Sequence, residues 1–126
     1  MTGESPKSLR VLIVEDEALV AMLLEDMLSD AGYELAATVN AIPAALSYVS
    51  EQAAEFDFAI LDVNLNGVPI FPVAEALAAL GKPFAFSTGY GNGGLPVQWR
   101  DRPTLQKPFG SADVERVLGA TLANVG

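Results

Sequence analysis

The run Phe58-Ala59-Ile60-Leu61 is continuously apolar and ends in a carboxylate, Asp62. An apolar run without alternation predicts a strand that is covered on both faces, as in the middle of a parallel sheet. Because an ionised Asp is costly to bury inside such a strand, we expect Asp62 at the rim, where the strand leaves the core. In open parallel sheets ligands bind at this rim, outside the carboxyl ends of the strands.

Strand and helix patterns alternate along the rest of the chain. Strands are predicted at residues 9–14, 33–39, 56–65, 83–87 and 104–107. Apolar residues with helical spacing separate the first two strands: Leu19, Val20, Leu23, Leu24, Met27 and Leu28. Further helices are expected around Ala45, Leu77 and Val117, with Pro72 at the start of the third. This order predicts a doubly wound α/β domain with a five-stranded parallel sheet of order 2-1-3-4-5.

Residues at the predicted element ends give more local expectations. Asn40 is a candidate N-cap for the second helix, and Ser111 for the last. Gly32 and Gly81 are expected to end the first and third helices. Gly67 and Pro69 predict a break in the chain after Asp62.

One interval does not fit the alternation. Residues 89–102 contain four glycines and a proline, so a full-length fourth helix is not expected there. We predict a loop with one helical turn near Val97. Residues 1–8 are polar and predict a flexible tail, so the domain is expected to span residues 9–126.

Composition excludes several kinds of chemistry. The chain has no cysteine and no histidine, which rules out disulfides, thiolate chemistry, a His base and a Cys- or His-ligated metal. The net charge of −9 argues against nonspecific binding to nucleic acid or anionic membranes. No apolar run reaches the length of about 20 residues that spans a membrane, and no signal peptide is evident, so a cytoplasmic location is expected.

Polar residues follow four of the predicted strands. Glu15 and Asp16 end the first, Asp62 the third, Thr88 the fourth and Lys107 the fifth. In the predicted sheet order these ends converge, and the three carboxylates would repel one another without a cation. An all-oxygen ligand set favours Mg²⁺ over zinc or copper, and Mg²⁺ readily accepts phosphate oxygens. An Asp carboxylate can act as a nucleophile toward a phosphoryl group, and Lys107 and Thr88 could bind its oxygens.

This set of residues resembles the receiver domain of two-component response regulators over about residues 9 to 122. The resemblance implies a flavodoxin-like fold and phosphorylation at Asp62. It further implies that Mg²⁺ is held by Asp16, Asp62, the backbone carbonyl of Asn64, and Glu15 through water. It assigns Thr88 as the switch hydroxyl and Lys107 as the lysine that pairs with the phosphoryl group.

Two departures from the family pattern concern the switch. Thr104 stands where receivers commonly have an aromatic switch residue, three positions before the lysine. The segment from Phe86 to Gly91 is similar to the signature of the FATGUY subclass, which is often single-domain and associated with HWE-type histidine kinases. A poorly formed fourth helix is also typical of that subclass. Tyr90 is the candidate for an aromatic residue that repacks instead.

The resemblance implies a non-enzymatic phosphoacceptor that dephosphorylates itself slowly. Its expected partners are a histidine kinase and a downstream protein, without direct contact with nucleic acid or membrane. The sequence leaves open whether the chain acts as a relay, a phosphate sink, an inhibitor or an adaptor that needs no phosphorylation. A metal-dependent phosphohydrolase is disfavoured because Asn64, and not a second Asp, stands two residues after Asp62.

Overall fold

A computed structural model describes residues 8–89 and 95–123. Five parallel strands form one sheet in the order β2-β1-β3-β6-β7. They are β1 (Arg10–Val14), β2 (Glu34–Val39), β3 (Phe58–Asp62), β6 (Phe84–Thr88) and β7 (Thr104–Gln106). The helices are α1 (Ala18–Asp30), α2 (Ile42–Glu51), α3 (Phe71–Ala79) and α4 (Ser111–Thr121). The predicted doubly wound, flavodoxin-like sheet and its strand order are confirmed.

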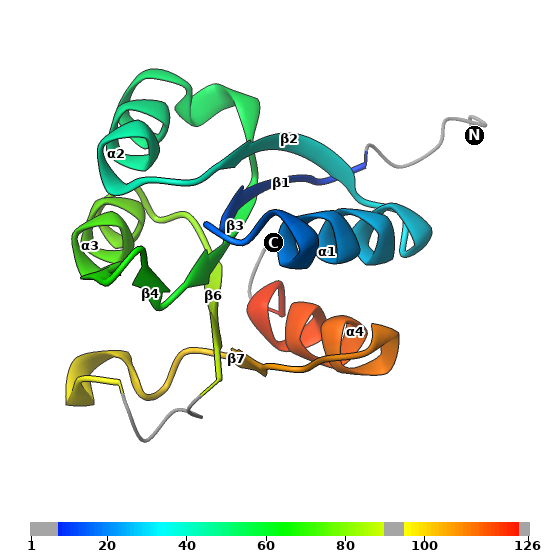
Figure 1. The fold of residues 1–126 in the computed structure, drawn as a ribbon. Coiled ribbons are helices and arrows are strands. Elements are labelled where there is room, and N and C mark those ends of the chain that lie inside the picture. The colour runs from blue at the N-terminus through cyan, green and yellow to red at the C-terminus, as the bar shows by residue number, and fades with distance from the viewer. Residues whose placement is uncertain (1–7, 90–94, 124–126) are drawn as a thin grey trace.

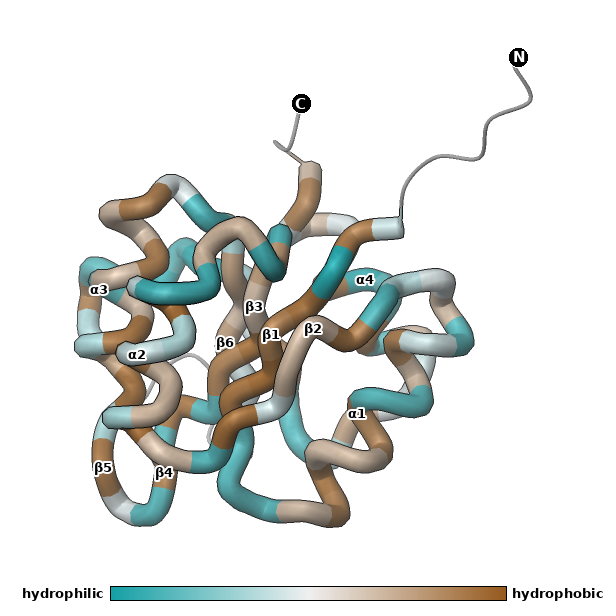
Figure 2. Tube along the Cα trace, turned by 90° about the horizontal axis from the view of Figure 1, so that it is seen from above, coloured by the Kyte–Doolittle hydropathy of each residue, from teal (hydrophilic) through white to brown (hydrophobic). Residues whose placement is uncertain are grey.

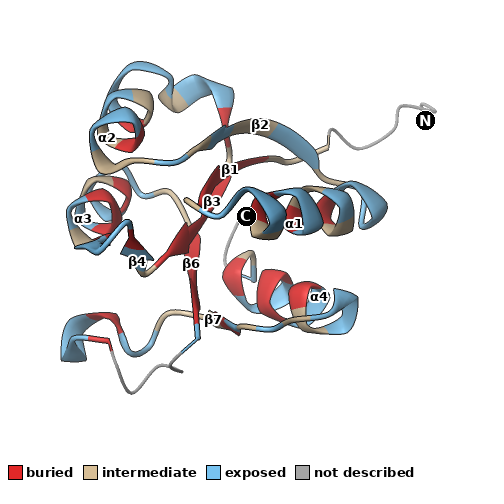
Figure 3. Ribbon diagram, in the orientation of Figure 1, coloured by how far each residue is buried: buried red, intermediate tan, exposed pale blue. Residues whose placement is uncertain are grey.

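The helices form a layer on each face of the sheet. Helices α2 and α3 cover one face, and α1 and α4 cover the other (Figure 1). Apolar side chains of β1, β3 and β6 alternate between the two resulting cores, so each of these strands contains an unbroken apolar run (Figure 2). The edge strand β2 is much more exposed than β1 and β3 (Figure 3).

Helix α1 is less one-sided than its sequence pattern predicted. Leu24 and Leu28 are buried against the sheet, as expected for the apolar face. Leu19 and Leu23, however, are 75% and 55% exposed. These two leucines have the predicted helical spacing but lie outside the buried face, because the apolar stripe of this helix is wider than the strip that the sheet covers.

Both predicted N-cap residues were wrong. The cap of α2 is Ala41, and no side chain of the described residues bonds to that helix start. Ser111 is the first residue of α4, whose cap is Gly110. There the Asp113 carboxylate accepts a hydrogen bond of 2.8 Å from the Gly110 amide. Gly32 and Gly81 lie just past their helices with φ of 96° and 71°, the left-handed backbone that favours glycine, as predicted.

The predicted break after Asp62 is in fact a small β-hairpin. Strands β4 (Asn64–Leu65) and β5 (Val68–Pro69) pair antiparallel through a two-residue turn. Asn66 and Gly67 have φ values of 54° and 81°, the positive values that type I′ hairpin turns require. The Asn-Gly pair is a strong hairpin signal in sequences, so this element could have been predicted.

The connection from β6 to β7 contains no α-helix among its described residues. The part of the chain that the structure describes contains two short 3₁₀ helices: η1 (Ala53–Glu55) and η3 (Val97–Trp99), which is the helical turn predicted near Val97. Trp99 is 6% exposed and contacts the rings of Phe84 and Phe86 edge-on. Its indole ring therefore joins the core on the face of the sheet that α2 and α3 also cover. Tyr90 and residues 1–7 lie outside the described part of the chain.

Candidate functional site

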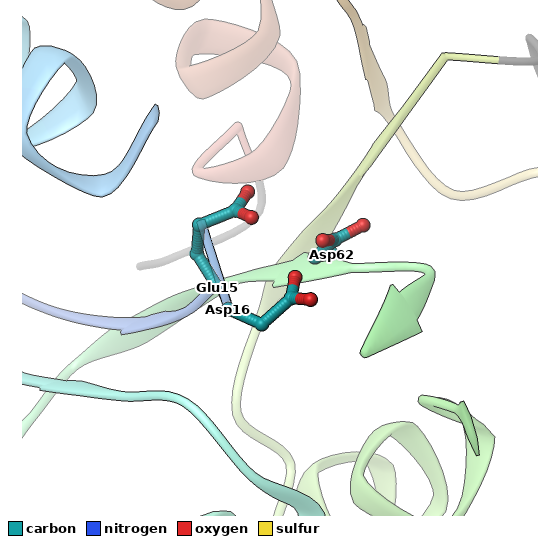
Figure 4. A group of neighbouring side chains, drawn as sticks. All are labelled: Glu15, Asp16 and Asp62. Carbon is teal, nitrogen blue, oxygen red and sulfur yellow. The ribbon is translucent and has the colours of Figure 1, made fainter. Parts of the chain in front are cut away.

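Three carboxylates meet at the carboxyl ends of the two central strands. Glu15 and Asp16 directly follow β1, and Asp62 is the last residue of β3 (Figure 4). Carboxylate oxygens of the three residues lie within 4.8 Å of one another. They are close because β1 and β3 pair in register, with Val14 opposite Leu61, and so end at the same level.

Lys107 supplies the positive charge of this group. It follows β7 and is positioned by its backbone amide, which donates a 2.9 Å hydrogen bond to the carbonyl of Thr88. Its Nζ lies 3.1 Å from Glu15 Oε1 and 3.5 Å from Asp62 Oδ2. A third acid, Glu17, has its Oε1 3.8 Å away. The lysine is thus shared, and its shortest contact is with Glu15.

Backbone amides hold each of the three carboxylates. The Glu17 amide donates to Glu15 Oε2 at 3.0 Å, and the Asn64 amide donates to Asp62 Oδ1 at 3.3 Å. At the tip of the β4–β5 hairpin, the Asn66 amide donates to Asp16 Oδ2 at 3.1 Å. The Asn66 side chain also donates to the carbonyl of Asn40, which ties the hairpin to the end of β2. The hairpin is therefore connected directly to the acidic pair.

Burial and like charge make Asp62 hard to ionise. Desolvation, followed by the neighbouring Glu15 and the contact with Asp16, raises the pKa of Asp62 to about 7, although Lys107 acts in the opposite direction. Asp16 is more exposed than Asp62. Desolvation works to raise the pKa of Asp16, but hydrogen bonds with Asp62 and with the Asn66 amide outweigh it and lower that pKa.

Lys107 is held in its charged form. Desolvation works to lower the pKa of the Lys107 ammonium, but its hydrogen bond with Glu15 and the charge of Asp62 outweigh it and raise the pKa. The ammonium therefore stays protonated across the physiological range and offsets part of the negative charge of the site. It cannot balance all three carboxylates, and the remaining negative charge suits a cation.

A small cavity opens beside Asp62. It has a volume of about 290 Å³ and is lined by Asp62, Val63, Asn64, Pro69, Phe71, Thr88 and Gly89. Thr88 is the last residue of β6 and is 4% exposed. Thr88 at the end of β6 and Lys107 just after β7 therefore lie at the same rim of the sheet as Asp62. The space beside the carboxylate is large enough for a phosphoryl group.

The residues fit a hard divalent cation. Three carboxylates with mutually close oxygens form the only such group of potential metal-binding side chains within residues 8–89 and 95–123. Carboxylate oxygen is the ligand that Mg²⁺ prefers. The pKa of Asp62 is raised first by burial and then by the charge of Glu15, and a cation would relieve that repulsion. Asn64 lies two residues after Asp62 and lines the adjoining cavity, and its carbonyl as a fourth ligand stays a prediction.

Sequence reasoning placed the main residues at this rim but missed two contacts. Glu15, Asp16, Asp62 and Lys107 come together, and Thr88 and Asn64 line the adjoining cavity. The ion pair between Glu17 and Lys107 was not predicted, and neither was the hydrogen bond that the Asn66 amide donates to Asp16. The Asn-Gly turn signal could have placed Asn66 at a hairpin tip, but nothing in the sequence indicates that this tip reaches Asp16.

Within the described residues, none of the helices has the length and apolar character needed to cross a membrane.

The comparison with curated proteins found no match.

Solved structures similar to this chain include SdrG and two PhyR response regulators. SdrG from Sphingomonas melonis Fr1 is 46% identical with a TM-score of 0.81, and the match covers 91% of this chain and 97% of SdrG. The receiver domain of the PhyR response regulator from Erythrobacter litoralis is 28% identical with a TM-score of 0.77, covering 93% and 92%. The response regulator PhyR from Brucella abortus is 26% identical with a TM-score of 0.77, and the match covers 93% of this chain but only 49% of that protein.

A family model, the response regulator receiver domain, matches residues 11–87. That match runs from the first central strand through the acidic rim to Ser87, next to Thr88. Lys107 lies beyond it, but the fold places its ammonium on the same carboxylates. With the sequence match and the geometry of the rim in agreement, the chain belongs to the receiver-domain family of response regulators.

Proposed function

We propose that this receiver domain is a phosphoacceptor that takes a phosphoryl group on Asp62 from a histidine kinase. The observation that carries the proposal is the position of Asp62, at the end of a central strand with an ammonium group 3.5 Å away and a cavity beside it. A carboxylate whose pKa is strongly shifted by burial and by specific charged neighbours, and which lies beside a cavity, is typical of functional sites.

In the proposed reaction, an ionised oxygen of Asp62 attacks the phosphorus of a phosphohistidine. The new bond is an acyl phosphate O–P bond, and the P–N bond to the imidazole breaks. Lys107 offers N–H donors and positive charge to the transferred oxygens, moving away from its shorter contact with Glu15. Thr88, at the next strand end, is placed to donate its hydroxyl to another of these oxygens.

We further propose that Mg²⁺ is required, held by Asp16, Asp62 and the Asn64 carbonyl, with Glu15 acting through water. The cation would offset the charge of the carboxylates and of the phosphoryl oxygens. Glu15 suits an indirect role because Lys107 and the Glu17 amide already occupy its two oxygens. The Asn64 amide binds only one oxygen of Asp62, and the Asn66 amide binds only one oxygen of Asp16, so each carboxylate could offer its other oxygen to the ion.

The phosphoryl signal is proposed to leave through a protein surface. A phosphoryl group adds a charge of about −1.5 to −2 and strong acceptor oxygens beside Thr88. Thr88 begins the connection that leads through η3 to β7, so a change at its hydroxyl acts on that segment first. The partner kinase is proposed to be of the HWE type, as for the FATGUY subclass. The chain itself turns over no external phosphoester and only dephosphorylates itself slowly.

Labelling from a phosphorylated histidine kinase in the presence of Mg²⁺ tests the acceptor. Wild-type protein should gain one phosphoryl group that hydroxylamine removes, as expected of an acyl phosphate. Asp62→Asn should gain none, whereas the exposed α1 variant Asp30→Asn should be labelled normally. Hydroxylamine-sensitive labelling that persists in Asp62→Asn would contradict the assignment.

A second measurement separates acceptance from signalling. Thr88→Ala should still be phosphorylated, because the nucleophile and Lys107 are intact, but it should lose the change in partner affinity. If phosphorylated Thr88→Ala binds the partner as wild type does, Thr88 is not the switch. If partner binding in wild type is unaffected by phosphorylation, the chain is a phosphate sink or an adaptor.

A further inference from the structure

A second cavity lies at the end of the sheet opposite Asp62. Its lining includes residues that precede four strands by one or two positions: Leu9 before β1, Asp57 before β3, Pro83 before β6 and Arg102 before β7. The volume is about 550 Å³. Sites for small molecules typically measure about 300–1,000 Å³, so this cavity is large enough for one. The acidic rim and the proposed phosphorylation do not involve it.

Arg102 presents an unused hydrogen-bonding edge to this cavity. Its guanidinium carbon lies 4.2 Å from the ring centroid of Phe84 and 5.8 Å from that of Trp99. This stacking fixes the plane of the guanidinium without using its N–H groups. In residues 8–89 and 95–123 no carboxylate or carbonyl accepts a hydrogen bond from it. A fixed, unoccupied guanidinium fork matches the geometry of a carboxylate or phosphate.

The other charged groups leave the cavity positive. Lys82 also lines it, and its Nζ is held by the Phe56 carbonyl at 2.7 Å. Asp57 is the one acidic residue in the lining, and it is already paired: its carboxylate accepts from the Arg10 amide at 2.7 Å and lies 3.5 Å from Arg10 Nε. Two cations therefore face the cavity in a chain whose net charge is −9.

The remaining lining is mostly apolar. The apolar residues of the lining are Leu9, Ala78, Leu80 and Pro83. Leu80 is 50% exposed, although it lies at the end of α3, a helix that packs on the core. An apolar wall next to a fixed cationic fork can bind a molecule that has both an apolar body and an anionic group.

We propose that this cavity binds a small organic oxyanion. The carboxylate or phosphate would occupy the fork of Arg102 with Lys82 beside it, and the apolar body would lie on Leu80 and Pro83. Because Arg102 and Trp99 belong to the connection between β6 and β7, a bound ligand would stabilise the segment that begins at the proposed switch residue. The site is thus a place where a metabolite could act on signalling without touching Asp62.

The single tryptophan of the chain gives a direct readout. Phenyl phosphate and benzoate are titrated without Mg²⁺ while Trp99 fluorescence and the Trp99 indole N–H resonance are followed. Benzyl alcohol, which has the ring but no charge, and inorganic phosphate, which has the charge but no ring, are the reference compounds. Saturable changes are expected with phenyl phosphate, benzoate or both, and weaker ones with either reference compound. A response to only one of the two anions identifies the ligand as a phosphate or a carboxylate.

Substitutions of Arg102 test whether its guanidinium binds a ligand or only packs on the rings of Phe84 and Trp99. Arg102→Gln should weaken binding by about tenfold or more, since hydrogen bonds to charged groups contribute roughly 1.5–3 kcal/mol. Arg102→Lys keeps the charge but not the fork, and it should also bind more weakly. Arg116→Gln, on the exposed face of α4 where Arg116 pairs with Asp113 at 3.2 Å, should bind as wild type does. The proposal is overturned if no probe saturates, or if folded Arg102→Gln and Arg102→Lys both bind like wild type.

Discussion

At the scale of residues, the acidic rim depends on one shared ammonium group. Lys107 Nζ is closer to Glu15 than to Asp62, at 3.1 against 3.5 Å. Phosphorylation would add negative charge on the Asp62 side, which should draw the lysine toward Asp62 and weaken its contact with Glu15. The lysine would then report the state of Asp62 by a small movement between two existing partners.

The pH dependence of stability should reveal the environment of Asp62. Its pKa is about 7 in the folded chain, first because of burial and then because of Glu15, but about 3.9 in an unfolded chain. Between these values the folded state binds a proton that the unfolded state has released. Without Mg²⁺, the free energy of unfolding should therefore fall as pH rises through this window, by at most about 1.4 kcal/mol per pH unit for one proton.

Urea unfolding from pH 5 to pH 8 in the presence of a chelator measures this slope. Asp62→Asn should remove it and should be more stable than wild type at pH 8, because the neutral amide avoids the repulsion from Glu15. Equal slopes in the two proteins would mean that another group is responsible.

At the scale of elements, the β4–β5 hairpin is the connection between the acidic pair and the rest of the chain. Its tip, Asn66, bonds both to Asp16 and to the end of β2. The turn depends on positive φ at Asn66 and Gly67. Disturbing the backbone of this turn should therefore affect cation binding as well as stability.

Gly67→Ala should destabilise the domain by about 1–2 kcal/mol, because φ is 81° there. An added Cβ would meet no atom within 4 Å, so the effect comes from the backbone alone. Gly119→Ala is a matched control within α4, also without a contact within 4 Å, and it should stabilise by about 0.5–1 kcal/mol. Thermal unfolding should show these opposite signs, and Mg²⁺ binding should weaken only in Gly67→Ala. Unchanged Mg²⁺ affinity there would show that the hairpin does not help to hold Asp16.

The segment after Thr88 should change its protection from amide hydrogen exchange when a phosphoryl mimic is bound at Asp62. We predict that amide exchange between residues 89 and 102 differs with and without beryllofluoride, since this segment starts at Thr88 and Trp99 is its main core contact among the described residues. Protection changes that occur only elsewhere would place the switch on another surface. The role of Tyr90 as the repacking residue stays a prediction.

At the scale of the whole molecule, the two helix layers and the sheet order were predictable, because the central strands contain unbroken apolar runs and glycines lie just past α1 and α3. The convergence of Glu15, Asp16, Asp62 and Lys107 followed from that order alone. Helix caps were less predictable, since Asn40 and Ser111 are good cap residues that tertiary contacts left unused. The exposure of Leu19 and Leu23 could not be foreseen, because apolar spacing does not show how wide a strip the sheet covers.

Mg²⁺ should stabilise the whole domain through this one rim. At a concentration tenfold above its dissociation constant, a ligand of the folded state alone adds about 1.4 kcal/mol, which should raise the melting temperature by several degrees. Asp16→Asn removes one proposed ligand and should reduce the shift. An equal shift in both proteins would place the bound ion elsewhere.

The strand order has a consequence for the growing chain during synthesis. The central strand β1 is made first, but its neighbour β3 follows only about 50 residues later, and Lys107 emerges after both. Until then the nascent chain carries Glu15, Asp16 and Asp62 without the ammonium that offsets them. A ribosome-bound chain that ends before residue 107 should therefore fold poorly at this rim, and a divalent cation should help it most at that stage.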